Sequence, residues 1–376
     1  SMVELGFLNK IIDELMQRRN EVTYQLFAEV EPDPDIKTVR KGVELMNSFK
    51  PDTIIALGGG SPIDAAKAMW IFYEHPEVNF DDLKQKFMDI RKRAFKYPEL
   101  GRKSKLICIP TTSGTGSEVS PFAVISDKEN LKKYPLTDYS LTPSIAIVDP
   151  EFTTNLPAKS TAYTGMDVLT HAIEAYTSVM ASDFTDGLAL EAIKLVFEYL
   201  PRAVKDGKHD LKAREKMHNA ATIAGMAFAN AFLGLTHSLA HKIGGEYHLV
   251  HGQTCAILLP HVIRYNGTVP TKLSLWPKYE EYQCDKKYME ICRMIGIHAE
   301  TGEEGTKKLA DAVMALGKEV GIDMNFNSLV PDEKVWKKNL ETIAYLAYED
   351  QCTPANPRVP LVKDMEQIML DAYKGN

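Results

Sequence analysis

Two short apolar runs, each followed by a loop of glycine and hydroxyl residues, most strongly constrain the fold of this chain. The run Asp52 to Leu57 leads into Gly58-Gly59-Gly60-Ser61-Pro62, and the run at 105–110 leads into Thr111-Thr112-Ser113-Gly114-Thr115. Continuous apolar runs of this length are typical of strands that are buried on both faces of a parallel sheet. Helical patterns at 7–17, 35–49 and 64–75 alternate with these runs, which predicts a doubly wound α/β domain.

The pattern changes after Pro157. Before it we also expect strands at 24–30, 119–125 and 144–149, whereas after it nearly every segment is rich in Ala and Leu and has helical periodicity. We therefore expect an α/β nucleotide-binding domain over residues 1–155 and an all-helical domain over 156–376. A cleft between two such domains is a favoured position for a site.

Charge and cysteine content exclude several classes of function. The chain has 44 basic and 51 acidic residues, so its net charge of −7 argues against nucleic acid as a partner. No apolar run approaches the ~20 residues that a membrane span needs, so we expect no membrane partner. The five cysteines are scattered and form no C-x-x-C pair, and the N-terminus has no charged region followed by an apolar one as in a signal peptide. We therefore expect a reducing, cytoplasmic location.

The glycine loops are candidate phosphate sites. Glycines allow close approach of a backbone, and we expect Ser61 to cap the following helix and Pro62 to occupy its first turn. The N–H groups at such a helix start attract a phosphate. The first loop matches neither G-x-G-x-x-G nor a Walker sequence, so an ordinary strand-to-helix turn stays open as an alternative. Two such loops at one sheet edge favour a dinucleotide.

Histidines are concentrated in one stretch of the second half, where five of the ten lie between 237 and 261. Asp167 and His171 are spaced i, i+4 on a predicted helix, His237 and His241 repeat that spacing, and His251 follows. Three imidazoles and one carboxylate suit Zn²⁺, Fe²⁺ or a similar ion. Packed or exposed histidines are the alternative, but burying so many polar rings without partners is costly. The pair His237/His241 lacks the glutamate of H-E-x-x-H, which argues against a metallohydrolase.

Four long motifs, at 58–68, 110–125, 165–176 and 234–266, resemble the iron-dependent (group III) alcohol dehydrogenases, and the similarity extends over essentially the whole chain. Further motifs at 86–101, 134–149 and 350–358 are similar to the alcohol dehydrogenase half of bifunctional aldehyde–alcohol dehydrogenases of fermenting bacteria. In those proteins a coenzyme-A-acylating aldehyde dehydrogenase precedes this half. The resemblance implies a dehydroquinate synthase-like fold, with a nucleotide-binding α/β domain and an all-α metal-binding domain.

The resemblance also implies roles for individual residues. Asp167, His171, His237 and His251 match the four metal ligands, with Fe(II) as the usual ion and Zn²⁺ as a possible substitute. His241 matches a catalytic histidine beside the nicotinamide and the substrate. The residues that match the NAD(H)-binding positions are Gly58, Gly59, Gly60, Ser61, Asp64, Thr111, Thr112, Ser113 and Lys133.

One departure from the family pattern concerns the start of the chain. Members normally begin with a strand and a ribose-contacting Asp, and this sequence starts at about the end of that unit. We therefore expect the first strand of the parallel sheet to be missing. The residue that distinguishes NAD from NADP is expected to be missing with it.

These expectations combine into one reaction. The resemblance implies reversible reduction of acetaldehyde, or a similar short aldehyde, to ethanol with NADH, with the metal as Lewis acid on the substrate oxygen. The expected partners are the small alcohol or aldehyde, the aldehyde dehydrogenase domain of the same polypeptide, and further copies of the chain. A zinc-dependent polyol (glycerol-type) dehydrogenase, a dehydroquinate-synthase-like lyase and a filament-forming structural half are the alternatives.

Overall fold

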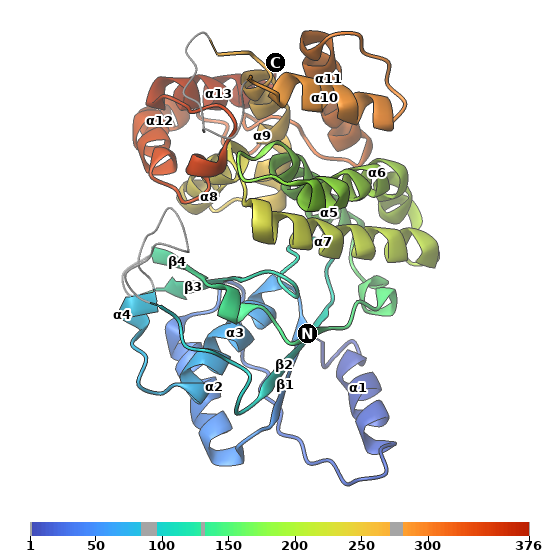
Figure 1. The fold of residues 1–376 in the computed structure, drawn as a ribbon, viewed down its shortest axis with the longest axis vertical. Helices are drawn as coiled ribbons and strands as arrows, with labels where there is room; N and C mark the ends of the chain where they lie inside the picture. Colours follow the sequence, from blue (N-terminus) through green and yellow to red (C-terminus); the bar gives the residue numbers. More distant parts are fainter. Residues whose placement is uncertain (1, 84–95, 129–131, 271–280, 376) are drawn as a thin grey trace. The chain divides into compact units, whose positions relative to one another are not determined.

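The chain divides into two compact units. A computed structural model describes residues 2–83, 96–128, 132–270 and 281–375. The N-terminal unit comprises Ser1–Thr112 and Gly116–Thr153, and the helical unit comprises Ser113–Thr115 and Thr154–Asn376. The expected change from an α/β region to a helical region is confirmed (Figure 1).

A parallel sheet forms the centre of the N-terminal unit. Strand β1 (Thr53–Gly58) pairs with β2 (Lys105–Pro110) in register from Thr53 opposite Lys105 to Gly58 opposite Pro110. The short β5 (Ile145–Ala146) lies parallel to β2 on its other side, so the strand order is β1-β2-β5. Because β1 and β2 end together, their loops are neighbours, and the Thr111 amide donates to the Gly58 carbonyl at 2.9 Å.

Helix α3 (Gly60–Glu74) connects the sheet to the rest of this unit. It packs against β1 and β2 and also against α2 (Ile36–Phe49) and β3 (Phe122–Asp127). Residues on all sides of α3 are therefore buried, including Ile63, Trp70 and Ile71. The remaining helices of the unit are α1 (Phe7–Met16) and α4 (Phe80–Leu83).

Three of the strands expected from sequence differ in the structure. Residues 24–30 form no regular element and are mostly exposed, because no strand among the described residues accepts their backbone hydrogen bonds. The segment expected at 119–125 becomes β3 (Phe122–Asp127), which pairs antiparallel with β4 (Lys132–Thr137) in a separate two-stranded sheet. Of residues 144–149, only Ile145 and Ala146 form a strand, and the Ser144 and Ile147 amides on either side donate to carbonyls of β2.

The helical unit is built around α5 (Ala158–Thr177). Almost every residue of α5 from Thr161 onward is buried, because α6 (Asp183–Asp206), α7 (Leu211–Ala231) and α9 (His251–Asn266) all pack against it (Figure 1). The other α-helices among the described residues are α8 (Leu235–Tyr247), α10 (Cys284–Met294), α11 (Gly302–Glu319), α12 (Glu333–Tyr348) and α13 (Val362–Lys374).

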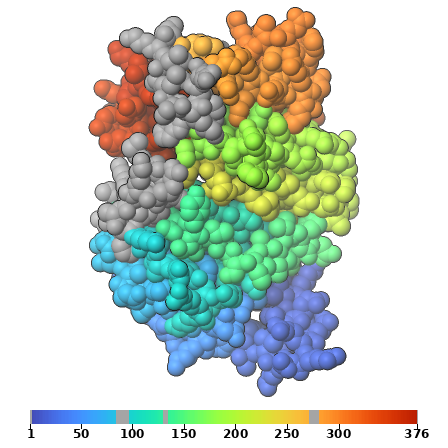
Figure 2. Space-filling model, in the orientation of Figure 1, coloured from blue at the N-terminus to red at the C-terminus, as the bar shows by residue number. Residues whose placement is uncertain are grey.

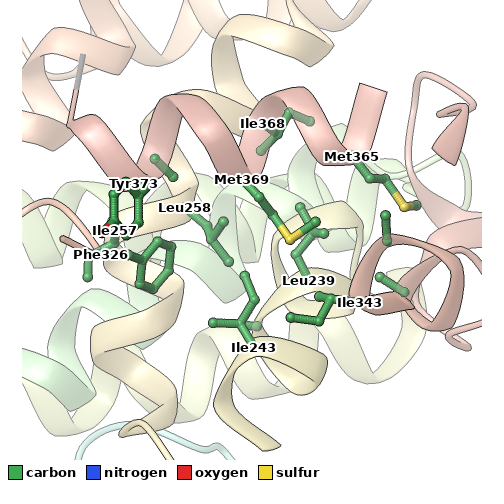
Figure 3. Packing of buried hydrophobic residues seen from close by; sticks show 14 of the residues in the cluster. Leu239, Ile243, Ile257, Leu258, Phe326, Ile343, Met365, Ile368, Met369 and Tyr373 are labelled. Carbon is green, nitrogen blue, oxygen red and sulfur yellow. The ribbon is translucent and has the colours of Figure 1, made fainter. Parts of the chain in front are cut away.

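A hydrophobic core joins α8, α9, α12 and α13. Figure 3 shows side chains from these four helices meeting in one cluster, with Ile243, Leu258, Ile343 and Met369 among them. Trp336 is fully buried in this cluster and stacks on Phe326 with ring centroids 4.9 Å apart. The cluster holds α8 and α9, which carry three of the histidines singled out above, in fixed positions.

Helices α10 and α11 pack against each other and form the orange lobe in the view of Figure 2. In the part of the chain that the structure describes, no single helix is long and apolar enough to cross a membrane. Helices α7 and α8 reach that length and composition only together, and they meet at an angle of 105°. Their apolar residues are mostly buried within the helical unit.

Gly252, in the first turn of α9, sets how closely α9 approaches α5. A Cβ atom at this position would lie 2.3 Å from the carbonyl oxygen of Tyr163 and 3.4 Å from the Cβ of Asp167. Backbone atoms cannot move aside as a side chain can. Only glycine therefore allows His251 and Asp167, on the two helices, to approach as they do.

We predict that Gly252→Ala lowers the free energy of unfolding by about 1–3 kcal/mol, because the methyl group forces α9 away from α5. The matched control is Gly245→Ala in α8, where a Cβ would meet no atom within 4 Å. That control should be neutral or stabilising by up to ~1 kcal/mol. Urea denaturation followed by circular dichroism measures both, and equal effects of the two substitutions would refute the packing argument.

Candidate metal centre

Helix α5 presents three polar side chains on one face within an otherwise apolar interior. Asp167, His171 and Glu174 follow one another at helical spacing, so they lie on the same side of the helix. The side chains of Asp167 and His171 are only 5% and 6% exposed. Burial of a carboxylate is costly unless other groups compensate its charge. The charge of Asp167 therefore has to be compensated by the groups around it.

Three imidazoles from three helices converge on one oxygen of Asp167. The Nε2 atoms of His171 (α5), His237 (α8) and His251 (α9) lie 3.9, 3.7 and 3.5 Å from Asp167 Oδ1. Donors ~2.0–2.2 Å from one ion in tetrahedral arrangement lie ~3.4 Å apart. The structure thus brings the four residues together at nearly the spacing that one divalent ion requires.

Two of the converging atoms form no hydrogen bond with a residue that the structure describes. Asp167 Oδ1 and His237 Nε2 are buried without a hydrogen bond among the described residues, and so is the second ring nitrogen of His171, Nδ1. A buried polar atom left without a partner costs about 1–3 kcal/mol. An ion bound between Asp167 and the three Nε2 atoms would remove that cost at Asp167 Oδ1 and His237 Nε2. The residues therefore fit a divalent metal.

The electrostatics of the cluster agree with this fit. Burial alone would raise the pKa of Asp167, but the imidazoles, His171 foremost, hold it well below its usual range, so the carboxylate stays anionic. Burial lowers the pKa of His171 to about 4, which leaves a neutral ring with a lone pair to donate. Burial also opposes protonation of His237, but the nearby carboxylates of Asp167 and Glu174 raise its pKa to about 9. A bound cation would take the place of that proton between two carboxylates.

Glu174 orients His237 and was not identified from the sequence. Its carboxylate accepts hydrogen bonds from His237 Nδ1 at 2.7 Å, from the Thr236 amide at 2.6 Å and from the Gly234 amide at 2.9 Å. It therefore fixes the ring with Nε2 facing Asp167, and it also satisfies amides at the start of α8. Its position one turn after His171 is the only signal for it in the sequence.

His241 lies beside the cluster. Its Nδ1 is 3.2 Å from Asp350 Oδ2, which also accepts from Lys242 Nζ at 2.7 Å. Its ring stacks on that of His251, with centroids 5.6 Å apart and planes 14° from parallel. The side chain of His241 is 35% exposed, whereas Asp350 is buried. Asp350, distant in sequence and not identified there, therefore sets the orientation of this ring.

In the N-terminal unit, the first glycine loop has no room for side chains. A Cβ at Gly58, where φ is +154°, would lie 2.6 Å from the Pro62 ring, and one at Gly59 would lie 3.2 Å from Thr112. Pro62 lies in the first turn of α3, as expected, but the expectation that Ser61 caps this helix is wrong. Gly59 is the N-cap, and Ser61 Oγ instead accepts a hydrogen bond from the Asp33 amide at 3.3 Å.

The other predicted cofactor residues occupy different surroundings. Asp64 accepts from Ser117 Oγ at 2.5 Å and from the Val124 amide at 2.9 Å, so both of its oxygens have partners within the protein. Thr111 and Thr112 lie beside the first loop. Ser113 belongs to the helical unit, where its Oγ lies 3.1 Å from His218 Nδ1. Lys133 lies in β4 opposite Ser126, but its side chain is outside the described part of the structure.

We predict that Glu174→Gln weakens binding of a divalent ion about 10–100-fold, because His237 loses the charged acceptor that orients it. Metal affinity, measured by competition with a chelator, reports this effect without any assay of activity. The control is Glu191→Gln on the exposed side of α6, where the side chain is 49% exposed. Affinity unchanged in Glu174→Gln would show that the carboxylate only caps α8.

The chain is similar in sequence to known proteins. The family descriptions "Iron-containing alcohol dehydrogenase" and "Fe-containing alcohol dehydrogenase family, C-terminal" match residues 1–150 and 161–373. The aldehyde-alcohol dehydrogenase of Streptococcus pneumoniae is 65% identical over 375 residues, which are 100% of this chain and 42% of that protein. The chain therefore spans less than half the length of this curated relative.

Two further proteins are covered over most of their length. The NADPH-dependent butanol dehydrogenase of Clostridium saccharobutylicum is 44% identical, over 100% of this chain and 90% of that protein. The solved structure of an iron-containing alcohol dehydrogenase from Thermococcus thioreducens superposes with a TM-score of 0.86 at 34% identity, covering 100% of this chain and 91% of that one. The chain belongs to the iron-containing alcohol dehydrogenase family.

Proposed function

We propose that this chain catalyses the reversible, NADH-dependent reduction of acetaldehyde, or a similar short aldehyde, to ethanol. The observation that carries this proposal is the convergence of three imidazoles on one buried oxygen of Asp167, with two of the facing atoms lacking a hydrogen-bond partner in the described part of the chain. Membership in the family supports the reaction class, and the similarity to aldehyde-alcohol dehydrogenases supports the short aldehyde.

Asp167, His171, His237 and His251 would hold the ion, Fe(II) in the first instance, although Zn²⁺ accepts the same ligand types. When bound, such an ion supplies Lewis-acid polarisation of the substrate oxygen. Asp167 contributes the only negative charge among these four side chains, and Glu174 keeps the His237 ring in its orientation. We further propose that residues 156–376 form this metal-binding domain.

We propose that residues 1–155 form the domain that binds NAD(H), the hydride donor. Backbone N–H groups of Gly58, Gly59 and Gly60, at the start of α3, would bind its pyrophosphate, and the lack of side chains there allows close approach. Ser61, Thr111 and Thr112 would add hydroxyl groups. Ser113 and Lys133 are proposed as further contacts to NAD(H) because they match cofactor-binding positions of the family. Asp64, whose oxygens both have internal partners, would shape the loop.

His241 is the proposed proton-exchanging residue. Because Asp350 accepts from its Nδ1, Nε2 is the ring nitrogen that can take a proton from the alcohol or return one to the reduced aldehyde. Its partial exposure would let it exchange that proton with water. Asp350 would hold the ring in place during both directions of the reaction.

Two partners are proposed for this chain, one from the length of a relative and one from the family resemblance. Since the chain spans 42% of the Streptococcus pneumoniae protein, which is named for both activities, we propose that an aldehyde dehydrogenase domain of the same polypeptide supplies the aldehyde. Further copies of the chain are proposed as assembly partners on the resemblance alone.

We predict that Asp167→Ala and His251→Ala each lose bound metal and NADH-dependent acetaldehyde reduction together, because each removes a donor from the same ion. His209→Ala, whose ring is 73% exposed in another part of the helical unit, is the control and should keep both. Elemental analysis and an NADH absorbance assay with added Fe²⁺ measure the two properties. Activity that survives without metal would contradict the Lewis-acid role, and preference for glycerol over ethanol in the reverse assay would favour a polyol dehydrogenase.

We predict that His241→Gln lowers kcat about 10²–10⁴-fold while metal content stays at the wild-type level, because the residue would move protons without binding the ion. Elemental analysis and steady-state kinetics on the same sample separate the two effects. An unchanged kcat would exclude proton exchange by His241. Loss of metal would instead make it part of the ion's binding site.

A further inference from the structure

A cysteine thiol lies beside the candidate metal centre. Cys255 is one turn after His251 on α9, and its Sγ lies 3.6 Å from His251 Nε2. Asp167, His237, His251 and Cys255 each offer a donor atom, and these four atoms all lie within 4.8 Å of one another. The cysteine side chain is fully buried, so its position is fixed by the packing of α9.

The spacing of these atoms suits a sulfur ligand. Zn–S and Zn–N bonds of ~2.3 and ~2.0–2.1 Å at a tetrahedral angle place sulfur and nitrogen ~3.6 Å apart, which is the separation of Cys255 Sγ and His251 Nε2. Among the described residues, Asp167 Oδ1 and His237 Nε2 are buried atoms without hydrogen-bond partners, and both residues belong to the same group. These unpartnered atoms point to a ligand at this position independently of the cysteine.

We propose that Cys255 is a metal ligand that gives this centre its preference among divalent ions. The proposal rests on the metal centre of the proposed function and deepens it. The four residues Asp167, His171, His237 and His251 offer three nitrogens and one oxygen. With Cys255 in place of His171, or in addition to it, the set includes sulfur, which favours Zn²⁺ and Co²⁺ over harder ions such as Mn²⁺.

The structure also distinguishes His171 from the other ligands. Of the three imidazoles, it makes the longest approach to Asp167 Oδ1, at 3.9 Å. Its ring stacks on that of His237, with centroids 4.7 Å apart and planes 16° from parallel, and packs against Phe228. Asp167, His237 and His251 then belong to both ligand sets, the one with His171 and the one with Cys255. The bound ion determines which of these two residues coordinates it. When sulfur coordinates, the thiol proton is released to solvent as the metal–sulfur bond forms.

Loading the whole chain with Co²⁺ tests this assignment. Sulfur coordination produces a near-ultraviolet charge-transfer band, whereas the visible d–d bands report Co²⁺ bound by any ligand set. We expect both in the wild-type protein, and Cys255→Ser should lose the charge-transfer band while keeping the visible bands. Cys292→Ser, at a buried thiol on α10 that donates to the Gly305 carbonyl, should keep both.

A second readout is the ratio of Zn²⁺ to Mn²⁺ affinity, which should fall by about tenfold or more in Cys255→Ser. Visible bands without charge transfer in the wild-type protein, or an unchanged affinity ratio in the variant, would overturn the role of Cys255 and leave the metal centre intact. A wild-type protein that binds no Co²⁺ would overturn the metal centre itself. The wild-type spectrum decides the question even if the serine variant does not fold.

Discussion

The Asp167 carboxylate is the group on which the rest of the site depends. It is an anion in the interior of a helical unit, and one of its oxygens faces three imidazoles without a hydrogen bond. A fold tolerates such an arrangement only if something compensates the buried charge. A divalent cation would do so, and its binding energy would then stabilise the packing of α5, α8 and α9 around it.

A second layer of residues holds this arrangement. Glu174 ties the start of α8 to α5 by three hydrogen bonds, one of them to the His237 ring. Asn356 Oδ1 accepts from the Leu235 amide in the first turn of α8 and from Asn266 at the end of α9, so the segment before α13 also fixes these two helices. Gly252 allows α9 to approach α5. The rings are thus positioned before any ion arrives, which lowers the conformational entropy lost on binding.

Local sequence patterns predicted those features of the fold and the site that depend on residues close together in the sequence. The i, i+4 pairs on apolar helices identified Asp167, His171 and His237. They also included His241, which lies beside the cluster, and did not include His251. Two apolar runs identified the parallel strands β1 and β2. The predictions that were wrong concern residues whose conformation depends on partners that are distant in the sequence. Residues 24–30 alternate as a strand would but have no strand beside them, and Ser61 bonds to Asp33 rather than capping its own helix. Glu174 and Cys255 lie one helical turn after His171 and His251, but their contacts with other helices depend on long-range packing, and no local spacing marks Asp350.

The most direct test of the central claim is an anomalous difference map from crystals of the iron-loaded protein. A single peak is predicted within ~2.0–2.3 Å of Asp167 Oδ1 and the Nε2 atoms of His237 and His251. A protein that binds stoichiometric iron with its peak elsewhere, or with these side chains turned away from one another, would contradict the account.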